Sequence, residues 1–265
     1  MPSTADAAIA AVRTGHDGLA ARVAGFDDAD LGRRSGAADW TVAQVLGHLG
    51  SGAELAAGTL AAALAGAPPP GEDVAPTVWA RWDAMTPREQ AEEFERADAA
   101  LVAAFEALDA ATRTDLQVPL AFLPQPVGVD AMAALRLNEV ALHGWDVAVA
   151  DDPAATLDPA AVPVLVDALA GPLSFLVGFL GRTGPTAATL AVTTSDPRRL
   201  LTLSLGAQVS LRAGEPPDAD GTLTLPAEAW LRLLAGRLGD ERTEVGVGTS
   251  GPFGLAALRA SFPGF

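Results

Sequence analysis

The spacing of the hydrophobic residues changes once along the chain, and this change restricts the possible folds. Up to about residue 185, apolar residues recur every three or four positions, which is typical of helices that bury one face. Beyond it, segments such as 189–194 (TLAVTT) and 201–205 (LTLSL) alternate between apolar and polar residues, which is typical of strands. We therefore predict two domains: a helical bundle over residues 1–184 and a smaller mixed α+β domain over 185–265.

Capping residues and prolines delimit the helices that we expect in the first domain. Thr41 and Gln44 have the spacing of a capping box, in which each side chain binds the backbone N–H of the other residue. Thr86 and Glu89 repeat this spacing, with a proline between them at the first helical position. The predicted long helices cover about residues 5–25, 41–64, 86–108 and 130–150, and a further helical segment covers 159–180.

The second domain is expected to contain five strands and two helices, one of which is clearly amphipathic. The predicted strands cover residues 189–194, 201–205, 209–212, 221–225 and 243–247, and the predicted helices cover 226–237 and 253–262.

Charge and composition exclude several kinds of function. The chain has 17 basic and 33 acidic residues, a formal net charge of −16, so it lacks the basic surface that binds nucleic acid or anionic membranes. It contains no cysteine and no tyrosine, which excludes disulfides, cysteine-ligated metals and a cysteine nucleophile. We therefore predict that the protein binds neither nucleic acid nor membranes.

The sequence shows no sign of a targeting segment. Its first residues are polar and lack the basic start and long apolar run of a signal peptide. The most apolar stretch, 160–180, contains Asp167, Gly171 and Pro172, so we interpret it as a buried helix or pair of helices rather than a membrane span. A soluble, cytoplasmic protein is expected.

Four polar residues form a stripe along the helix predicted over 130–150. Arg136, Glu139, His143 and Asp146 are three or four positions apart, so they lie on one face of the helix. A solvent-exposed face is the simple alternative. The residues around the stripe are apolar, however, and burying charges without partners costs several kcal/mol each. The pattern therefore favours a functional site inside the bundle.

The helix predicted over 41–64 carries a second polar set, Gln44, His48 and Ser51, among apolar residues. His48 alone would be interpreted as a structural histidine. Together with Glu139 and His143, it forms a set of two imidazoles and one carboxylate from two helices. Three such ligands leave a coordination position open for water or substrate.

His16 is one of only three histidines in the chain. It lies in a polar, glycine-rich piece of the first predicted helix, 14–18 (TGHDG). We expect it to be exposed and not to take part in the site.

The segments 39–49 (DWTVAQVLGHL) and 138–148 (NEVALHGWDVA) resemble the mycothiol-dependent maleylpyruvate isomerase family of actinobacteria. This family belongs to the wider group of DinB-like metal-binding four-helix bundles. Residues 224–237 and 246–262 are similar to the small sterol-carrier-like α+β domain that follows the bundle in family members. The resemblance covers nearly the whole chain.

This resemblance implies a metal site and two catalytic residues. His48, Glu139 and His143 would bind a divalent metal, normally zinc. Asp146 matches a family position thought to act in catalysis. Arg237 is the best match to an arginine that reaches the site from the second domain.

Two assignments at the edge of this site are less specific. Arg232 and Arg242 lie close to Arg237 in the sequence and are alternatives to it. Trp40 lies eight residues before His48, where the family often has tryptophan. We interpret Trp40 as a core residue that precedes a helix cap.

The resemblance also implies the reaction. The family uses mycothiol, a small cysteine-containing sugar conjugate, and a metal with an open position lowers the pKa of a bound thiol. The thiolate would add to an electrophilic small molecule, allow rotation and leave, as in the cis–trans isomerisation of maleylpyruvate. If the adduct is kept, the enzyme is an S-transferase. Arg237 or Arg136 would pair with a substrate carboxylate, and Asp146 would orient a ligand or move a proton.

Three alternatives remain at this stage. The protein could be a DinB-like zinc-dependent hydrolase in which bound water is the nucleophile. It could be a carrier that holds an apolar ligand in residues 185–265 and has a vestigial metal site. It could also be a structural bundle in which His48 and Glu139 simply bind each other.

Overall fold

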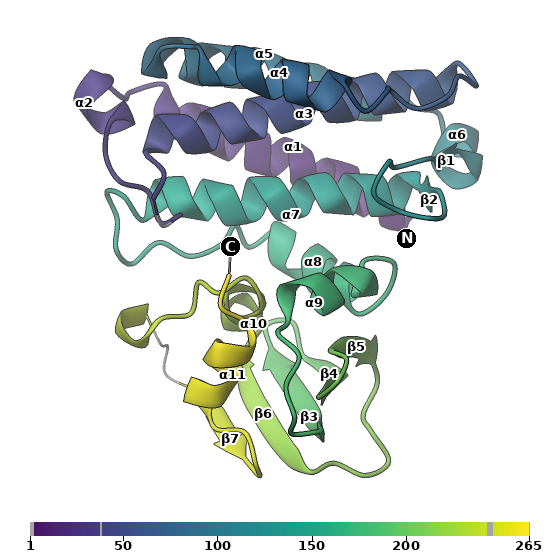
Figure 1. The fold of residues 1–265 in the computed structure, drawn as a ribbon, viewed down its shortest axis with the longest axis vertical. Helices are drawn as coiled ribbons and strands as arrows, with labels where there is room; N and C mark the ends of the chain where they lie inside the picture. The colour runs from purple at the N-terminus through teal and green to yellow at the C-terminus, as the bar shows by residue number, and fades with distance from the viewer. Residues whose placement is uncertain (1–2, 38, 243–245, 265) are drawn as a thin grey trace. The chain divides into compact units, whose positions relative to one another are not determined.

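Four long helices dominate the first half of the chain in the computed structural model, which describes residues 3–37, 39–242 and 246–264. Figure 1 shows them running side by side. They are α1 (Thr4–Val23), α3 (Val42–Leu64), α5 (Pro87–Glu106) and α7 (Val129–Ala148). Shorter elements connect them: α2 (Asp28–Leu31), α4 (Val74–Asp83), α6 (Ala110–Asp115), β1 (Gln117–Val118) and β2 (Val127–Gly128).

The helices begin where the capping residues predict. The side chain of Thr41 accepts a hydrogen bond from the N–H of Gln44, and the Gln44 side chain accepts one from the N–H of Thr41. Thr86 and Glu89 form the same reciprocal pair at the start of α5. These bonds satisfy backbone donors that a helix leaves free in its first turn. The predicted starts of α3 and α5 are thus confirmed.

The four long helices pack as a closed bundle. Helix α3 packs on α5 and α7, and α1 packs on the same two helices from the other side. The interior is filled by large side chains that have almost no exposed surface, among them Leu46, Leu49, Phe94, Leu101 and Leu137. The predicted four-helix bundle is therefore confirmed.

Helix α4 was not predicted from the sequence. It packs on α3 through Trp82, whose ring lies so close to Gly50 that an added Cβ there would be 2.1 Å from it. The indole N–H of Trp82 donates a hydrogen bond of 3.0 Å to the carboxylate of Glu54. Because Gly50 has no side chain, the ring of Trp82 can pack directly against α3 and α4 can dock there.

The chain divides into two compact units, Met1–Ala161 and Val162–Phe265. The division falls at the start of α8, earlier than the boundary expected at residue 185. The second unit begins with two helices, α8 (Ala161–Leu169) and α9 (Ser174–Leu180), and only then enters its sheet. The change of hydrophobic period thus marks the first strand of the second unit, not its first residue.

Five strands form the sheet of the second unit in the order β5-β4-β3-β6-β7. The neighbours β3 and β6 are parallel, and the other pairs are antiparallel. The strands are β3 (Ala188–Ser195), β4 (Arg199–Leu205), β5 (Ser210–Ala213), β6 (Gly221–Pro226) and β7 (Gly248–Ser250). The predicted mixed α+β character of the C-terminal part is confirmed.

Two helices and a 3-10 turn complete the second unit: α10 (Ala227–Leu234), η1 (Asp240–Arg242) and α11 (Leu255–Ser261). The helices occupy the positions predicted for them. The last predicted strand, 243–247, begins at residues 243–245, which lie outside the described residues. The strand described in this region is β7.

Within the described ranges, no single helix combines the length and the apolar character that crossing a membrane requires. The pair α8 and α9 would meet both criteria together, but the two helices are bent by 85° at the break between them.

Candidate functional site

The bundle brings together the three predicted metal-ligating residues. His48 lies on α3, and Glu139 and His143 lie one turn apart on the neighbouring helix α7. The carboxylate of Glu139 accepts a hydrogen bond of 3.0 Å from Nε2 of His48, and it lies 3.7 Å from Nε2 of His143. One donor atom from each residue lies within 4.8 Å of the other two. We call these three residues the His–Glu–His cluster.

The electrostatic environment keeps the carboxylate of the cluster ionised. Burial raises the pKa of Glu139, but the hydrogen bond from His48 and the charges of His143, His48 and Arg136 outweigh it and lower the pKa to about 2. The side chain still keeps 44% of its surface exposed. Near neutral pH, Glu139 is thus an accessible carboxylate, which is the form that binds metal ions.

Asp146 fixes the orientation of His143. Its carboxylate accepts a hydrogen bond of 2.9 Å from Nδ1 of His143, three residues earlier on α7. The side chain of Asp146 is fully buried. Because a carboxylate only accepts, this contact places the proton on Nδ1 and leaves Nε2 of His143 directed toward Glu139. The structure therefore places Asp146 behind one histidine of the cluster.

Trp40 covers the two histidines of the cluster. Its ring centroid lies 5.1 Å from that of His48 and 6.0 Å from that of His143, with the second pair stacked. The residue is 38% exposed. The prediction that Trp40 is a core residue is therefore wrong: it precedes the cap of α3, as expected, but its ring lies on the cluster.

A cavity of about 380 Å³ opens beside His48, between α3, α4 and α5. Its lining combines aromatic rings with amide, hydroxyl and carboxylate groups. The lining residues are Trp40, Gln44, Gly47, His48, Ser51, Trp79, Trp82, Asp83 and Gln90. Sequence reasoning found Gln44 and Ser51 near His48 but missed the contributions of α4, because that helix was not predicted.

The structure overturns the interpretation of His16 and Arg136. His16 is buried, not exposed, and Arg136 points into the bundle core rather than toward a substrate. Both bind Asp98 of α5, which has no exposed surface. The guanidinium donates hydrogen bonds of 3.0 and 2.6 Å to one carboxylate oxygen, and Nδ1 of His16 lies 2.8 Å from the other. We call these three residues the buried triad. Asp98 was not predicted from the sequence, because no motif in its own segment distinguishes it from the other acidic residues of α5.

Arg237 belongs to the second unit, where it follows α10. It is half-buried, and its guanidinium donates a hydrogen bond of 3.0 Å to the carbonyl of Ala235. Its assignment to the site stays a prediction.

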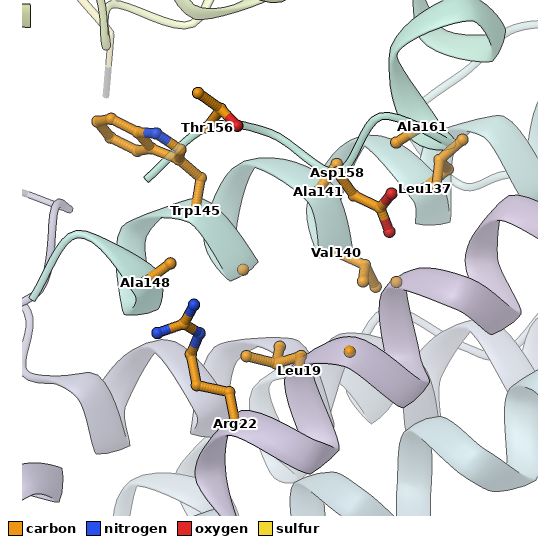
Figure 2. A pocket seen from close by; sticks show the side chains of 13 residues that line it. Leu19, Arg22, Leu137, Val140, Ala141, Trp145, Ala148, Thr156, Asp158 and Ala161 are labelled. Atoms are coloured by element: carbon orange, nitrogen blue, oxygen red, sulfur yellow. The ribbon is translucent and has the colours of Figure 1, made fainter. Parts of the chain in front are cut away.

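A second cavity, of about 200 Å³, lies between α1 and α7 on a different face of α7 (Figure 2). Its lining includes the apolar side chains of Leu19 and Val140 and the side chains of Arg22 and Trp145, which carry N–H donors. These two polar side chains bind the chain itself, Arg22 the carboxylate of Asp151 and Trp145 a backbone carbonyl. The His–Glu–His cluster does not line this cavity.

The fold and the cluster together define a class: a four-helix bundle with a candidate metal site between two of its helices, followed by a small α+β unit. Residues 12–148 match the family described as the mycothiol maleylpyruvate isomerase N-terminal domain. Because this match covers more than half of the chain, the chain belongs to that family. Among curated proteins, none matches this chain.

Two solved structures share the fold over nearly their entire length. One is a crystal structure of the mycothiol-dependent maleylpyruvate isomerase, with 17% sequence identity and a TM-score of 0.66 over 96% of this chain and 98% of that one. The other is a histidine-to-alanine mutant of that enzyme, with 16% identity and a TM-score of 0.65 over the same shares. The similarity extends through both units, which confirms the predicted fold class.

The buried triad predicts how stability depends on pH. Burial raises the pKa of Asp98, but the charge of Arg136 and the hydrogen bonds from His16 and Arg136 outweigh it, so the pKa lies below its ordinary value. The resulting stabilisation is complete above the unfolded pKa of about 3.9 and is lost as the pH falls through the folded value. We expect Asp98→Asn to lower the free energy of unfolding at pH 7 by about 3–5 kcal/mol, because Arg136 loses its partner, and this difference to shrink below about pH 4.

Urea denaturation of both proteins between pH 7 and pH 3 measures this difference. Asp115→Asn, at an exposed aspartate of α6, is the matched control and should track the wild type. If the free energies of unfolding of the wild type and Asp98→Asn differ by the same amount from pH 7 to pH 3, the lowered pKa assigned to Asp98 is contradicted.

Proposed function

We propose that this chain is a metal- and mycothiol-dependent enzyme that adds the thiol to an electrophilic small molecule, as an isomerase of maleylpyruvate or a related compound or as an S-transferase. The observation that carries this proposal is the His–Glu–His cluster, whose three donors converge from two helices beside a cavity. Family membership supports the thiol and the reaction class.

The cluster suits a divalent metal, most simply zinc. Two imidazole nitrogens and one ionised carboxylate are typical zinc ligands, and three protein ligands leave one position open. In this structure Nε2 of His48 donates a hydrogen bond to the carboxylate of Glu139. A metal ion would take the place of that proton between the two atoms. When bound, the metal would lower the pKa of a coordinated thiol, so that its thiolate is present at neutral pH.

The chain's own residues prepare this site. Asp146 holds the ring of His143 so that Nε2 is available as a ligand. The ring of Trp40 lies against both imidazoles on one side. The chain contains no cysteine, so the nucleophilic sulfur has to come from an external thiol.

The cavity beside His48 would receive the organic part of the thiol or of the substrate. The faces of Trp40, Trp79 and Trp82 offer apolar contact, and the side chains of Gln44 and Asp83 offer hydrogen bonds to hydroxyl and amide groups. A thiol that carries a sugar conjugate presents both kinds of surface.

The proposed reaction begins when the thiolate sulfur forms a bond to one carbon of the conjugated double bond. The π electrons move to the neighbouring carbonyl, and the former double bond becomes a single bond that rotates. Reversal of the electron flow restores the double bond in the trans form and expels the thiolate. In an S-transferase, a proton instead traps the adduct, and the carbon–sulfur bond is kept.

An arginine would bind the carboxylate of such a substrate. Arg136 does not fill this role, because its guanidinium is buried against Asp98. Arg237 of the second unit is the proposed candidate.

The alternatives differ in what they require of the cluster. A structural bundle would need only the hydrogen bond between His48 and Glu139, which is present. A zinc-dependent hydrolase would use the metal without a thiol, and a carrier would need neither. Metal analysis therefore separates the two enzymatic functions from the structural bundle and the carrier, and a thiol assay separates the two enzymatic functions from each other.

We expect the purified, untagged protein to contain about one divalent metal ion per chain, because three candidate ligand atoms lie within 4.8 Å of one another. His48→Ala and Glu139→Gln should each lower the metal content well below this value. Elemental analysis measures it, with circular dichroism to confirm the fold. Glu92→Gln, at a carboxylate of α5 outside the cluster, is the control. Unchanged metal content in both cluster variants would contradict the proposed site.

We expect turnover of maleylpyruvate to require mycothiol, since the sulfur is the proposed nucleophile. The assay compares initial rates with and without the thiol, at fixed zinc, and identifies the product as the trans isomer or the thiol adduct. Equal rates in both conditions would refute thiol chemistry and support the hydrolase. No turnover of this or other electrophiles by the metal-loaded protein would contradict both enzymatic functions.

Asp146→Asn tests whether Asp146 acts through His143. We expect zinc affinity to fall by about 10- to 100-fold, because the amide no longer enforces the orientation of the ring. Once zinc is saturating, kcat should recover to within a few-fold of the wild type. Competition with a chromophoric chelator gives the affinity. Unchanged affinity with kcat lowered by about 100-fold would instead assign proton transfer to Asp146.

A further inference from the structure

The buried triad of His16, Asp98 and Arg136 lies in the bundle next to the residues that form the proposed metal site. Arg136 is three residues before Glu139 on α7, and its guanidinium donates a hydrogen bond of 2.9 Å to the backbone carbonyl of Leu49. Leu49 directly follows His48 on α3. The same guanidinium lies 3.5 Å from the position that a Cβ of Gly52 would occupy. Arg136 thus fastens α7 to the backbone of α3 at the level of the cluster.

The remaining members of the triad hold this guanidinium in place. Asp98 of α5 binds Nε and Nη2 of Arg136 through one oxygen, and its second oxygen contacts His16 of α1. All three side chains are at most 6% exposed. The triad therefore connects all four long helices at one level, with Asp98 at its centre.

We propose that Asp98 and Arg136 are positioning residues, which set the separation of α3 and α7 so that His48, Glu139 and His143 converge on one metal ion. This inference rests on the proposed function, because it assigns the triad a role toward the proposed metal.

The chemistry of the triad supports this role over a purely stabilising one. A buried ion pair loses its hydration, and apolar residues of similar volume often stabilise a core as well or better. Hydrogen bonds to a guanidinium are, however, directional. The planar group of Arg136 can bind the carboxylate of Asp98 and the carbonyl of Leu49 together only when α5, α7 and α3 keep one separation. Apolar side chains would tolerate small shifts between α3 and α7, and metal ligands do not.

The test replaces the triad by apolar residues of similar size: His16→Leu, Asp98→Leu and Arg136→Met in one protein. The control is Leu60→Ala, at a fully buried residue on α3 that is twelve positions from His48. The control removes core packing on the same helix without touching the triad. Zinc affinity is measured for each protein by competition with a chromophoric chelator, and urea midpoints report stability.

A second readout needs no metal. Nitrogen-15 NMR of the metal-free protein reports the tautomer of each imidazole, and the triple variant keeps only His48 and His143. In the wild type and in Leu60→Ala, we expect His143 to carry its proton on Nδ1 in a single fixed state. In the triple variant, we expect the signals of both rings to broaden or average.

We expect the triple variant to fold with a midpoint at or above that of Leu60→Ala, yet to bind zinc about 10- to 100-fold more weakly than the wild type. Leu60→Ala should bind zinc as the wild type does. The inference is overturned if the triple variant retains wild-type affinity, or if Leu60→Ala loses as much. If the triple variant does not fold, Arg136→Lys takes its place, because lysine keeps the positive charge but lacks the planar guanidinium. Its zinc affinity and its imidazole tautomers then test the inference.

Failure of the proposed function gives a different result. If the wild type itself does not bind zinc, the proposed metal site is wrong, and the NMR comparison alone decides whether the triad orders the two imidazoles.

Discussion

The packing of α3 against α7 is the contact on which the candidate site depends. His48 and Glu139 are 91 positions apart in the sequence, and only this packing brings their side chains within 3.0 Å. The contact is not held by apolar residues alone, because Arg136 also binds the backbone of α3 beside His48. A small slide of one helix along the other would separate the two donors. The geometry of the site is therefore a property of the bundle and not of either helix.

The position of each charged residue on α7 shows how this packing assigns roles. The sequence predicts that Arg136, Glu139, His143 and Asp146 share one face of a helix, and all four lie on α7. Within it, Glu139 and His143 meet the histidine of α3, while Arg136 enters the core and Asp146 lies buried behind His143. Periodicity alone groups residues to within about a third of a turn, which is too coarse to separate a ligand from its support.

Local signals were therefore predictable, and features that depend on a distant partner were not. The capping box at Thr41 and the one-turn spacing of Glu139 and His143 are fixed within a few residues, so the sequence alone revealed them. The burial of His16 depends on Asp98, 82 positions away, which offers it a charged partner inside the core. A polar, glycine-rich surrounding predicts exposure only when no such partner exists. The position of the Trp40 ring was not predictable for the same reason, since the histidines that it covers come from two different helices.

The arrangement also indicates from which side a reactant would reach the cluster. His143 is closed on its Nδ1 side by a fully buried carboxylate, and the buried triad fills the core on the side of Arg136. The side of His48 is different, because a cavity of about 380 Å³ opens there under three tryptophans. The proposed isomerisation and S-transfer would share the step in which sulfur bonds to carbon, and they would differ in whether the thiolate leaves the adduct before a proton traps it. Trp40 both lines this cavity and lies against the two histidines, so its ring stands where the cavity meets the cluster.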